Sequence, residues 1–232
     1  MPIPPPPPTR IFLRDKFDLK RNCGPDFLDA IRKQLEFAAD GGIYLLASCS
    51  EQPFQLSTIT NEPPPSMMNI WRMPAWDSLY GAICASSETG WIKKHQKSVT
   101  REQQDLLVNF RLALGTSPPV LSTETVYLYE EIRMTGPRIP LEYQRALLAF
   151  SRRAKLLAQP WTWVCSATQV TSQPNLICLL WSAENVDAFE EGLKTLRAEP
   201  FFETMMSFVA NFTRRYMYPT EVEALARHHQ PA

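Results

Sequence analysis

The stretch "NIWRMPAWDSLYGAICASSETGW" runs from Asn69 to Trp91 and predicts one strand followed by one helix. An apolar run ends at Trp71–Arg72, a proline follows at position 74, and a helix-like segment leads to Trp91. Proline has no backbone N–H to give to a sheet, so it closes the strand. Three of the six tryptophans of the chain lie in this junction. Large flat side chains between a strand and a helix are typical of the wall of a ligand pocket.

A second copy of the same pattern follows about 115 positions later. "RIFLRDKFDLK" occupies residues 10–20, and "TVYLYEEIRM" occupies residues 125–134. A shift of 115 brings apolar residues of one segment onto apolar residues of the other, and it places Asp15 on Glu130. The chain is therefore expected to contain one structural unit twice.

A helix is expected after the first strand of each unit. Pro25 and Pro140, also 115 positions apart, each suit a helix start, where the missing N–H costs no hydrogen bond. Apolar residues then recur every three or four positions, which is the period of a helix with one buried face. These residues are Leu28, Ile31, Leu35 and Ala38 in the first unit and Tyr143, Leu147, Phe150, Ala154 and Leu157 in the second.

Two strand-like runs and a second helix complete each unit. The runs are "IYLLASCS" and "SMMNIWRM" in the first unit and "WTWVCSATQV" and "NLICLLWSA" in the second. Further helices are expected from about Ala75 and Val186, and final strands near Arg111–Leu114 and at "TRRYMYPT". The order βαββαβ is that of a ferredoxin-like unit. The predicted parts are an arm (1–9), two ferredoxin-like units (10–118 and 119–222) and a tail (223–232).

The central strands are apolar on both faces, whereas one face of a solitary ferredoxin-like sheet would be in water. "IYLLA" and "LICLLW" are nearly continuous apolar runs. The expected fold class is therefore α+β, with the two tandem units packing sheet against sheet and the helices outside, as a single-chain dimeric α+β barrel. Two separate units that each meet an outer partner are the alternative.

Composition excludes several classes of function. Lys+Arg and Asp+Glu are balanced at 24 each, so no net positive field attracts nucleic acid or an anionic membrane. No apolar run reaches the roughly 18 residues of a membrane span. The five cysteines form no CxxC pair, which favours a reduced, cytoplasmic protein. The proline-rich start lacks the apolar core of a signal peptide and is interpreted as a polyproline arm. A monomer or a homodimer fits these features equally.

The junctions "NIWRMPAWDSL…W" and "LLWSAENVDAFEEGLKTLRAEPFF" resemble those of the dimeric α+β barrel superfamily, especially NIPSNAP-like and antibiotic-biosynthesis-monooxygenase-like domains. The resemblance rests on a strand that ends in an aromatic residue, a helix, and an aromatic residue after a bend. Trp71, Trp91, Trp181, Pro200 and Phe201 hold those places. It implies a cavity between sheet and helices. It also implies activities that range from cofactor-free oxygenases, cyclases and isomerases to haem enzymes such as chlorite dismutases.

Two acids interrupt the apolar faces of the first strands and are the candidate catalytic bases. Asp15 shares its face with Ile11, Leu13 and Phe17, and Glu130 shares its face with Val126, Leu128 and Ile132. A carboxylate in apolar surroundings tends to gain a raised pKa and can then act as a general base. An arginine or lysine partner, or a position at the rim, is the alternative. Arg72, beside Trp71, is the candidate stabiliser of an enolate, with an exposed salt bridge as its alternative.

The candidate substrate-binding residues are aromatic. Tyr127 and Tyr129 occupy the other face of their strand, together with Glu131 and Arg133, and could orient a substrate or fill the space between two sheets. The other candidates supply flat walls, although core packing explains each of them as well. They are Trp71, Trp91, Trp163 and Trp181. Because Trp181 is followed by a serine and Trp71 by an arginine, the first unit is favoured for the working pocket.

His95 is the one histidine outside the C-terminal tail, where the others are His228 and His229. Its neighbours in "GWIKKHQK" are polar and basic, so a solvated side chain is expected. Metal-binding, phosphate-loop and serine-hydrolase motifs are lacking.

The leading hypothesis is therefore a cofactor-free enzyme of secondary metabolism that acts on an apolar aromatic or polyketide-like substrate. It would abstract a proton and then oxygenate, cyclise or rearrange the substrate. Asp15 or Glu130 would be the base, and Arg72 or a tyrosine would stabilise the enolate. A haem enzyme with His95 as the ligand and a non-catalytic binding or scaffold protein are the alternatives.

Overall fold

The computed structural model describes residues 11–20, 23–51, 66–78, 80–81, 91–109, 125–156, 161–169 and 173–226. The predicted arm at residues 1–9 lies outside these ranges, and so do the residues of the tail beyond 226. The chain divides into two compact units. The N-terminal unit consists of Arg10–Leu106 and the segment from Met217 onward, and the C-terminal unit contains Leu107–Tyr216. The structure therefore has a mixed α+β fold, and the paired strands in both units are antiparallel.

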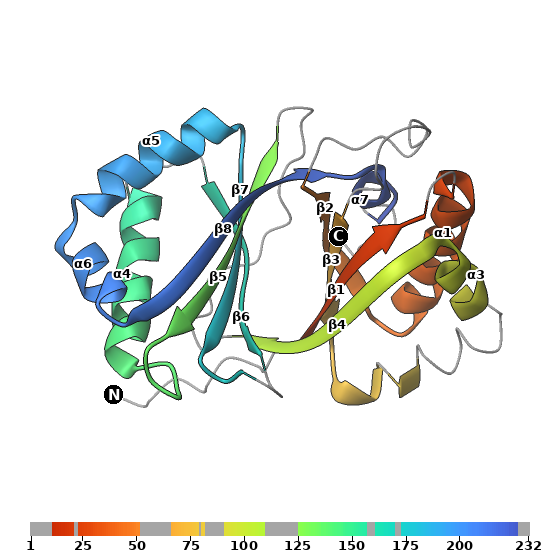
Figure 1. Ribbon diagram of the computed structural model, residues 1–232, viewed down its shortest axis with the longest axis horizontal. Helices are drawn as coiled ribbons and strands as arrows, with labels where there is room; N and C mark the ends of the chain where they lie inside the picture. Colours follow the sequence, from red (N-terminus) through yellow and green to blue (C-terminus); the bar gives the residue numbers. More distant parts are fainter. Residues whose placement is uncertain are drawn as a thin grey trace. The chain divides into compact units, whose positions relative to one another are not determined.

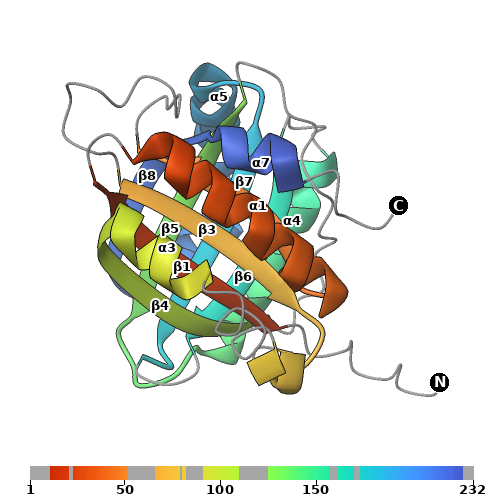
Figure 2. The same ribbon diagram turned by 90° about the vertical axis from the view of Figure 1, so that its right-hand side faces the viewer.

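The N-terminal unit is built on a sheet with β3 between β1 and β2. The elements of this unit are β1 (Ile11–Leu19), α1 (Gly24–Asp40), β2 (Tyr44–Ser50), β3 (Ser66–Met73), α3 (Trp91–Ser98), the first part of β4 (Val99–Asn109) and α7 (Glu221–Ala226). β1 and β2 both pair with β3, and the last residues of β8 pair with β2. Figure 2 shows α1 crossing the sheet, with α3 and α7 on either side of it.

The C-terminal unit has a similar order of elements. They are β5 (Val126–Met134), α4 (Leu141–Leu156), β6 (Trp161–Gln169), β7 (Leu176–Ala183), α5 (Val186–Arg197), α6 (Pro200–Met206) and most of β8 (Val209–Pro219). β5 and β6 both pair with β7, and the last residues of β4 pair with β6. Figure 1 shows α4, α5 and α6 on the same side of this sheet.

Apolar residues at the predicted helical spacing form the contact between helices and sheets. Ile31, Leu35 and Ala38 of α1 are buried in one core with Leu45 and Trp71. In α4 the buried residues include Tyr143, Leu147, Phe150 and Ala154. The helix after β7 begins where the sequence allows a good cap, because the Asn185 side chain accepts a hydrogen bond of 2.8 Å from the N–H of Ala188.

The end of the N-terminal unit differs from the sequence-based expectation. The final strand, β4, occupies Val99–Asn109, whereas the expected position near Arg111–Leu114 lies outside the described residues. Residues 101–104 of this strand are exposed and polar, so this segment lacks the apolar pattern from which a strand is predicted. Among the described residues, no helix has both the length and the apolar character needed to span a membrane.

Candidate functional site

A small cavity lies between the sheet and the helices of the C-terminal unit. Its volume is about 260 Å³, close to the lower end of the roughly 300–1,000 Å³ that is usual for small-molecule sites. The walls are mainly apolar and come from β5, β7, β8 and the three helices. The apolar lining residues are Leu128, Ile132, Leu147, Phe150, Leu179, Trp181, Leu193, Phe202, Met205, Met206, Val209 and Phe212, and the polar ones are Glu130, Tyr143, Arg197 and Arg214.

Glu130 is the buried acid of this cavity, and both of its carboxylate oxygens accept hydrogen bonds. Arg214 donates to Oε1 from Nε at 3.0 Å and from Nη2 at 2.7 Å. The indole Nε1 of Trp181 donates to Oε2 at 3.2 Å. A buried carboxylate with a guanidinium partner avoids the cost of an isolated buried charge. The arginine and the tryptophan therefore hold the carboxylate in one orientation.

Tyr143 places a hydroxyl group at the wall of the same cavity. The side chain is fully buried, and its oxygen has no hydrogen-bond partner among the described residues. Burial, and secondarily the charge of Glu130, raises the pKa of this phenol well above its ordinary value, so the hydroxyl keeps its proton. A buried hydroxyl without a partner costs roughly 1–3 kcal/mol. A ligand with an oxygen acceptor would remove this cost.

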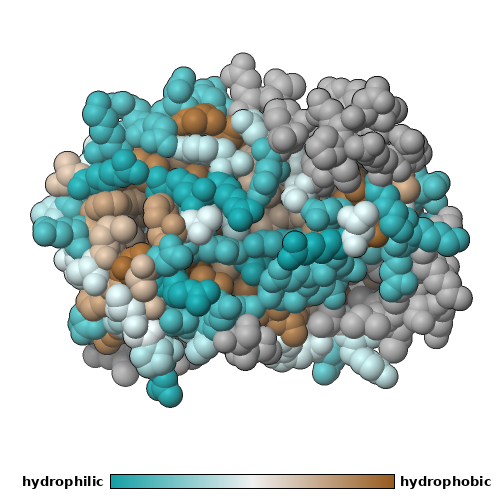
Figure 3. Space-filling model, viewed as in Figure 1, coloured by the Kyte–Doolittle hydropathy of each residue, from teal (hydrophilic) through white to brown (hydrophobic). Residues whose placement is uncertain are grey.

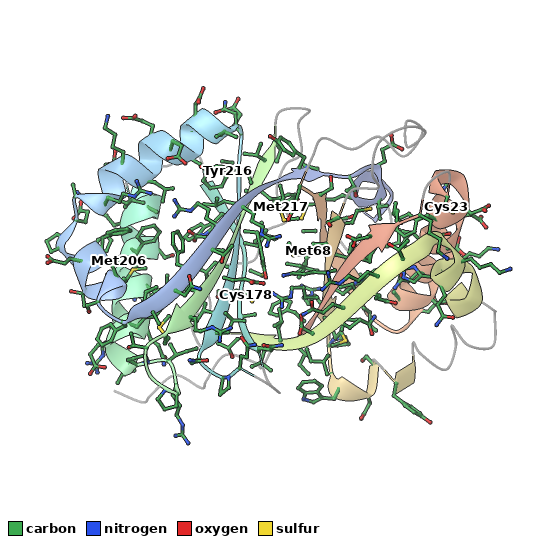
Figure 4. The ribbon with its side chains drawn as sticks, viewed as in Figure 1. Cys23, Met68, Cys178, Met206, Tyr216 and Met217 are labelled. Atoms are coloured by element: carbon green, nitrogen blue, oxygen red, sulfur yellow. The ribbon has the colours of Figure 1, made fainter. Side chains whose placement is uncertain are left out.

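The aromatic residues of the pocket contact one another edge to face. The rings of Phe150 and Trp181 have centroids 5.7 Å apart, and those of Phe150 and Phe201 are 5.9 Å apart. Phe212 and Met206 are 39% and 40% exposed, so part of the lining reaches the surface. Apolar side chains are visible at the surface around α6 in Figure 3. In Figure 4, Met206 lies on α6, and Tyr216 lies on β8, four residues after Phe212 of the cavity lining.

Asp15 occupies the corresponding place in the N-terminal unit. It is 4% exposed, and Oδ2 accepts a hydrogen bond of 2.8 Å from Nε1 of Trp71. Oδ1 has no hydrogen-bond partner among the described residues. Burial raises the pKa of this carboxyl to about 7; the charge of Glu102 adds to the rise, and the Trp71 N–H, Gln104 and His95 oppose it.

The sheet registers explain why each acid meets a tryptophan. Leu13 pairs with Trp71, two residues before Asp15, and Leu128 pairs with Trp181, two residues before Glu130. In an antiparallel sheet such diagonal neighbours share a face, and a long side chain can reach across. The structure therefore brings Asp15 and Trp71 together in one unit, and Glu130 and Trp181 together in the other.

Arg72 does not join Trp71, because successive residues of a strand point to opposite faces. Its guanidinium lies 5.5 Å from the centre of the Tyr44 ring. Tyr127 and Tyr129 likewise lie on the face of β5 opposite to Glu130. Tyr127 is fully buried, and the hydroxyl of Tyr129 donates a hydrogen bond of 2.7 Å to Glu131. These three candidates do not line the cavity described above.

Two of the predicted tryptophans lie at positions whose side chains the structure does not describe. Trp91 begins α3, and Trp163 lies in β6, where its backbone is paired with Trp181. Their side chains are outside the described part of the chain.

The interpretation of His95 as a solvated side chain is wrong. This residue is 6% exposed, and its ring contacts those of Phe17 and Phe27, at centroid distances of 5.8 and 6.0 Å. Its Nε2 lies 3.6 Å from Oε1 of Glu102, which belongs to the neighbouring strand. Among the described side chains of α3, those of His95 and Ser98 are buried, whereas those of Gln96 and Lys97 are exposed.

Sequence reasoning missed three polar residues of the cavity. Tyr143 was included only as part of an apolar helical stripe, and Arg214 only as part of the run "TRRYMYPT" of the expected final strand. Arg197 was not singled out. A hydroxyl within an otherwise apolar stripe was the available signal for Tyr143. For Arg214 the alternation of Phe212, Arg214 and Tyr216 along one strand face was a weaker signal.

Comparison with solved structures shows the type of fold. A "putative monooxygenase" from Lactobacillus acidophilus aligns with a TM-score of 0.60 and 12% identity, covering 91% of this chain and 94% of its own. A second "putative monooxygenase", from Fusobacterium nucleatum, aligns with a TM-score of 0.58 and 8% identity, covering 91% and 92%. Chlorite dismutase from Candidatus Nitrospira defluvii, in complex with imidazole, aligns with a TM-score of 0.54 and 7% identity, covering 95% and 94%.

These neighbours are members of the dimeric α+β barrel superfamily. No family model matches the sequence, and the search of curated proteins finds no match. At such low identity the similarity establishes the type of fold, while chemistry depends on the site itself.

Proposed function

We propose that the protein is an enzyme that binds a small apolar, aromatic substrate in the cavity of the C-terminal unit. The observation that carries the proposal is Tyr143, which lines an apolar cavity beside the Glu130–Arg214 pair and whose buried hydroxyl has no partner among the described residues. Apolar walls with a few convergent polar groups are characteristic of sites for small organic molecules. The neighbours described as monooxygenases have the same type of fold and are consistent with this class of function.

Each polar residue of the cavity would have a separate role in the reaction. The Tyr143 hydroxyl would donate a hydrogen bond to a carbonyl or phenol oxygen of the substrate. A carboxylate offers about four lone-pair sites, and three of those of Glu130 are used by Arg214 and Trp181. The remaining site on Oε2 would accept a proton from the substrate. Arg214 and Tyr143 would then stabilise the enolate or phenolate that is formed.

The reaction class that fits these roles is proton abstraction followed by oxygenation, cyclisation or rearrangement. A substrate anion with a delocalised charge can reduce molecular oxygen without a bound cofactor. For an aromatic ketone with an acidic CH₂ group, such as anthrone, the balanced outcome is one quinone and one water from one ketone and one O₂. A substrate from secondary metabolism of the polyketide type, and a cytoplasmic site of action, complete this proposal.

Haem fits the described site less well than an organic ligand does. The residues that line the cavity include no histidine and no cysteine. Tyr143 could in principle ligate iron, but its raised pKa opposes the phenolate that such a bond requires. His95 belongs to the N-terminal unit, where its ring is packed between two phenylalanines. No step of the proposed reaction is therefore assigned to a haem.

The arrangement of the chain as two tandem ferredoxin-like units in one barrel is part of the same proposal. Its support is the matching register of the two acid–tryptophan pairs. The alternating order of strands and helices in the two units also supports it. In such an arrangement one unit can keep a working cavity while the other becomes structural.

Oxygen consumption with anthrone tests the enzymatic proposal. We expect the purified protein to accelerate oxygen uptake, with anthraquinone as the product. Tyr143→Phe should lower kcat/KM by about 10²–10³-fold, because it removes one donor to the developing oxyanion. Tyr44→Phe is the matched control, since this tyrosine belongs to the other unit, and it should leave the rate unchanged.

Two outcomes would contradict the proposal. Uptake that is equal in the Tyr143→Phe variant and the unaltered protein would remove the cavity from the chemistry. Binding of anthrone without any turnover would favour the non-catalytic binding protein.

A further inference from the structure

The hydrogen-bonding groups that remain available in the cavity of the C-terminal unit are nearly all donors. Glu130, its one acidic residue, already accepts bonds on both oxygens. The Tyr143 hydroxyl has no partner among the described residues. Arg197 also lines the cavity and makes no ion pair within the described part of the chain. A ligand for this site must therefore supply acceptors, and the unpaired charge that it meets is positive.

Tyr143 and Arg197 both line the cavity but differ in burial. Tyr143 is fully buried, whereas Arg197 is exposed and ends α5. The exposed rings and thioether of Phe212 and Met206 belong to the same lining. An arginine in the last turn of a helix is favoured by the helix dipole, but that interaction leaves its N–H groups available. One cation, Arg197, thus belongs to the exposed part of an otherwise mainly apolar lining.

The charges of the lining support the same conclusion. Arg214 and Glu130 form an ion pair at 2.7 Å, which leaves Arg197 as the charged lining residue without an ion pair among the described residues; its charge acts on Tyr216, the hydrogen-bond donor to Glu190. A guanidinium binds carboxylates well, because its planar N–H groups match the two carboxylate oxygens. A cationic ligand would meet Arg197 without compensation and would leave the Tyr143 donor unused.

We propose that the natural ligand is an aromatic carboxylate, whose apolar body fills the cavity and whose charged group meets Arg197 at the open end. This inference rests on the proposed function, because it assigns a substrate class to the same cavity. It adds a specificity-determining residue, Arg197, that the reaction itself does not require.

Three naphthalene probes of similar size test the charge preference at neutral pH. They are naphthalene-2-carboxylate, the neutral methyl 2-naphthyl ketone and the cationic 2-naphthylmethylamine, and calorimetry measures their binding to the full chain. We expect the carboxylate to bind most tightly and the amine most weakly. Arg197→Gln should weaken the carboxylate about five- to tenfold and leave the ketone within about twofold, the size expected for a partly exposed ion pair. Arg145→Gln, another exposed arginine of the same unit, is the control.

The inference and the proposed function fail in different ways. Equal affinity for the acid and the ketone, unchanged by Arg197→Gln, would overturn the carboxylate assignment while the cavity still binds aromatic molecules. An equal loss of acid binding in the Arg145→Gln control would also overturn it, because a general surface charge would then be the cause. Failure of all three probes to bind, together with anthrone turnover unaffected by Tyr143→Phe, would overturn the cavity function as well.

Discussion

The two units hold a buried acid at the same place in their sheets but surround it differently. In the C-terminal unit Glu130 meets both Trp181 and Arg214. In the N-terminal unit Asp15 meets Trp71, and two residues of β4, Glu102 and Gln104, act on its carboxyl group in opposite directions. One acid is thus part of an ion pair at a cavity, and the other is a buried carboxyl with a pKa near 7.

The contrast shows that the cross-strand partner decides what a buried acid can do. Arg214 pairs with Glu130 and orients it beside the cavity, whereas burial is the dominant effect on Asp15 and the charge of Glu102 adds to it. The surroundings of the two acids also differ. Near Asp15, Phe17, Phe27 and His95 pack their rings together. Near Glu130, the lining leaves a cavity of about 260 Å³.

The largest expected effect concerns Asp15→Asn. Because the folded-state pKa of Asp15 is raised, the unfolded chain releases this proton first, so stability falls as pH rises from about 4 to about 7 and then levels off. The shift corresponds to at most roughly 4 kcal/mol at about 1.4 kcal/mol per pKa unit. The asparagine variant should remove this fall and be more stable than the unaltered protein at pH 8. Urea unfolding at pH 4, 6 and 8 measures the difference, with the less buried Asp18→Asn as the control. A difference that does not change with pH would contradict the raised pKa.

The next largest effect is expected for Arg214→Gln, which gives the C-terminal unit the partner that the N-terminal unit has. Removing one member of a buried ion pair leaves the other charge uncompensated, so the free energy of unfolding should fall by about 3 kcal/mol at pH 7. Arg145→Gln serves as the exposed control and should change stability by less than about 0.5 kcal/mol. The double variant Glu130→Gln/Arg214→Gln should recover part of the loss. If Arg214→Gln and the double variant have the same free energy of unfolding, an uncompensated charge on Glu130 is not the cause of the loss.

Replacing the two tryptophans by phenylalanine should separate structure from binding. Trp71→Phe and Trp181→Phe each remove an indole N–H that an acid accepts, and each should cost about 1–2 kcal/mol of stability. Only Trp181→Phe should also change the affinity for the naphthalene carboxylate, because Trp181 lines the cavity. Thermal unfolding and calorimetric titration of both variants provide the comparison. Equal effects on ligand affinity would mean that the two units share the binding function.

The smallest effect is expected for Gln104→Arg, which introduces into the N-terminal unit the kind of partner that Glu130 has. A cation near Asp15 should lower its pKa, since an opposite charge favours the ionised form. A shift of one unit is worth about 1.4 kcal/mol, and side-chain exposure at position 104 should reduce it below that value. The midpoint of the pH-dependent stability curve reports the change. A midpoint that stays in place would show that position 104 does not control the carboxyl.

Local sequence pattern was sufficient to predict most elements of the fold. The runs that form β2, β3, β6 and β7 are apolar and bounded by turn residues, and the stripes of α1 and α4 repeat with the helical period. The polar strand β4 was not predicted, because residues 101–104 carry no apolar alternation. His95 was misjudged because its neighbours in sequence are solvated, while the packing of α3 against α1 is a tertiary property.

The sequence by itself determined that each first strand would carry an acid on an apolar face, since the side chains of a strand alternate with a period of two. Only the tertiary structure decided which acid would meet an arginine. Arg214 and Glu130 are 84 residues apart, and Trp181 and Glu130 are 51 apart. Their contact depends on strand order and register, which long-range packing sets. Tyr143 became a lone donor for the same reason, because a hydroxyl is left without a partner only when the elements around it have closed.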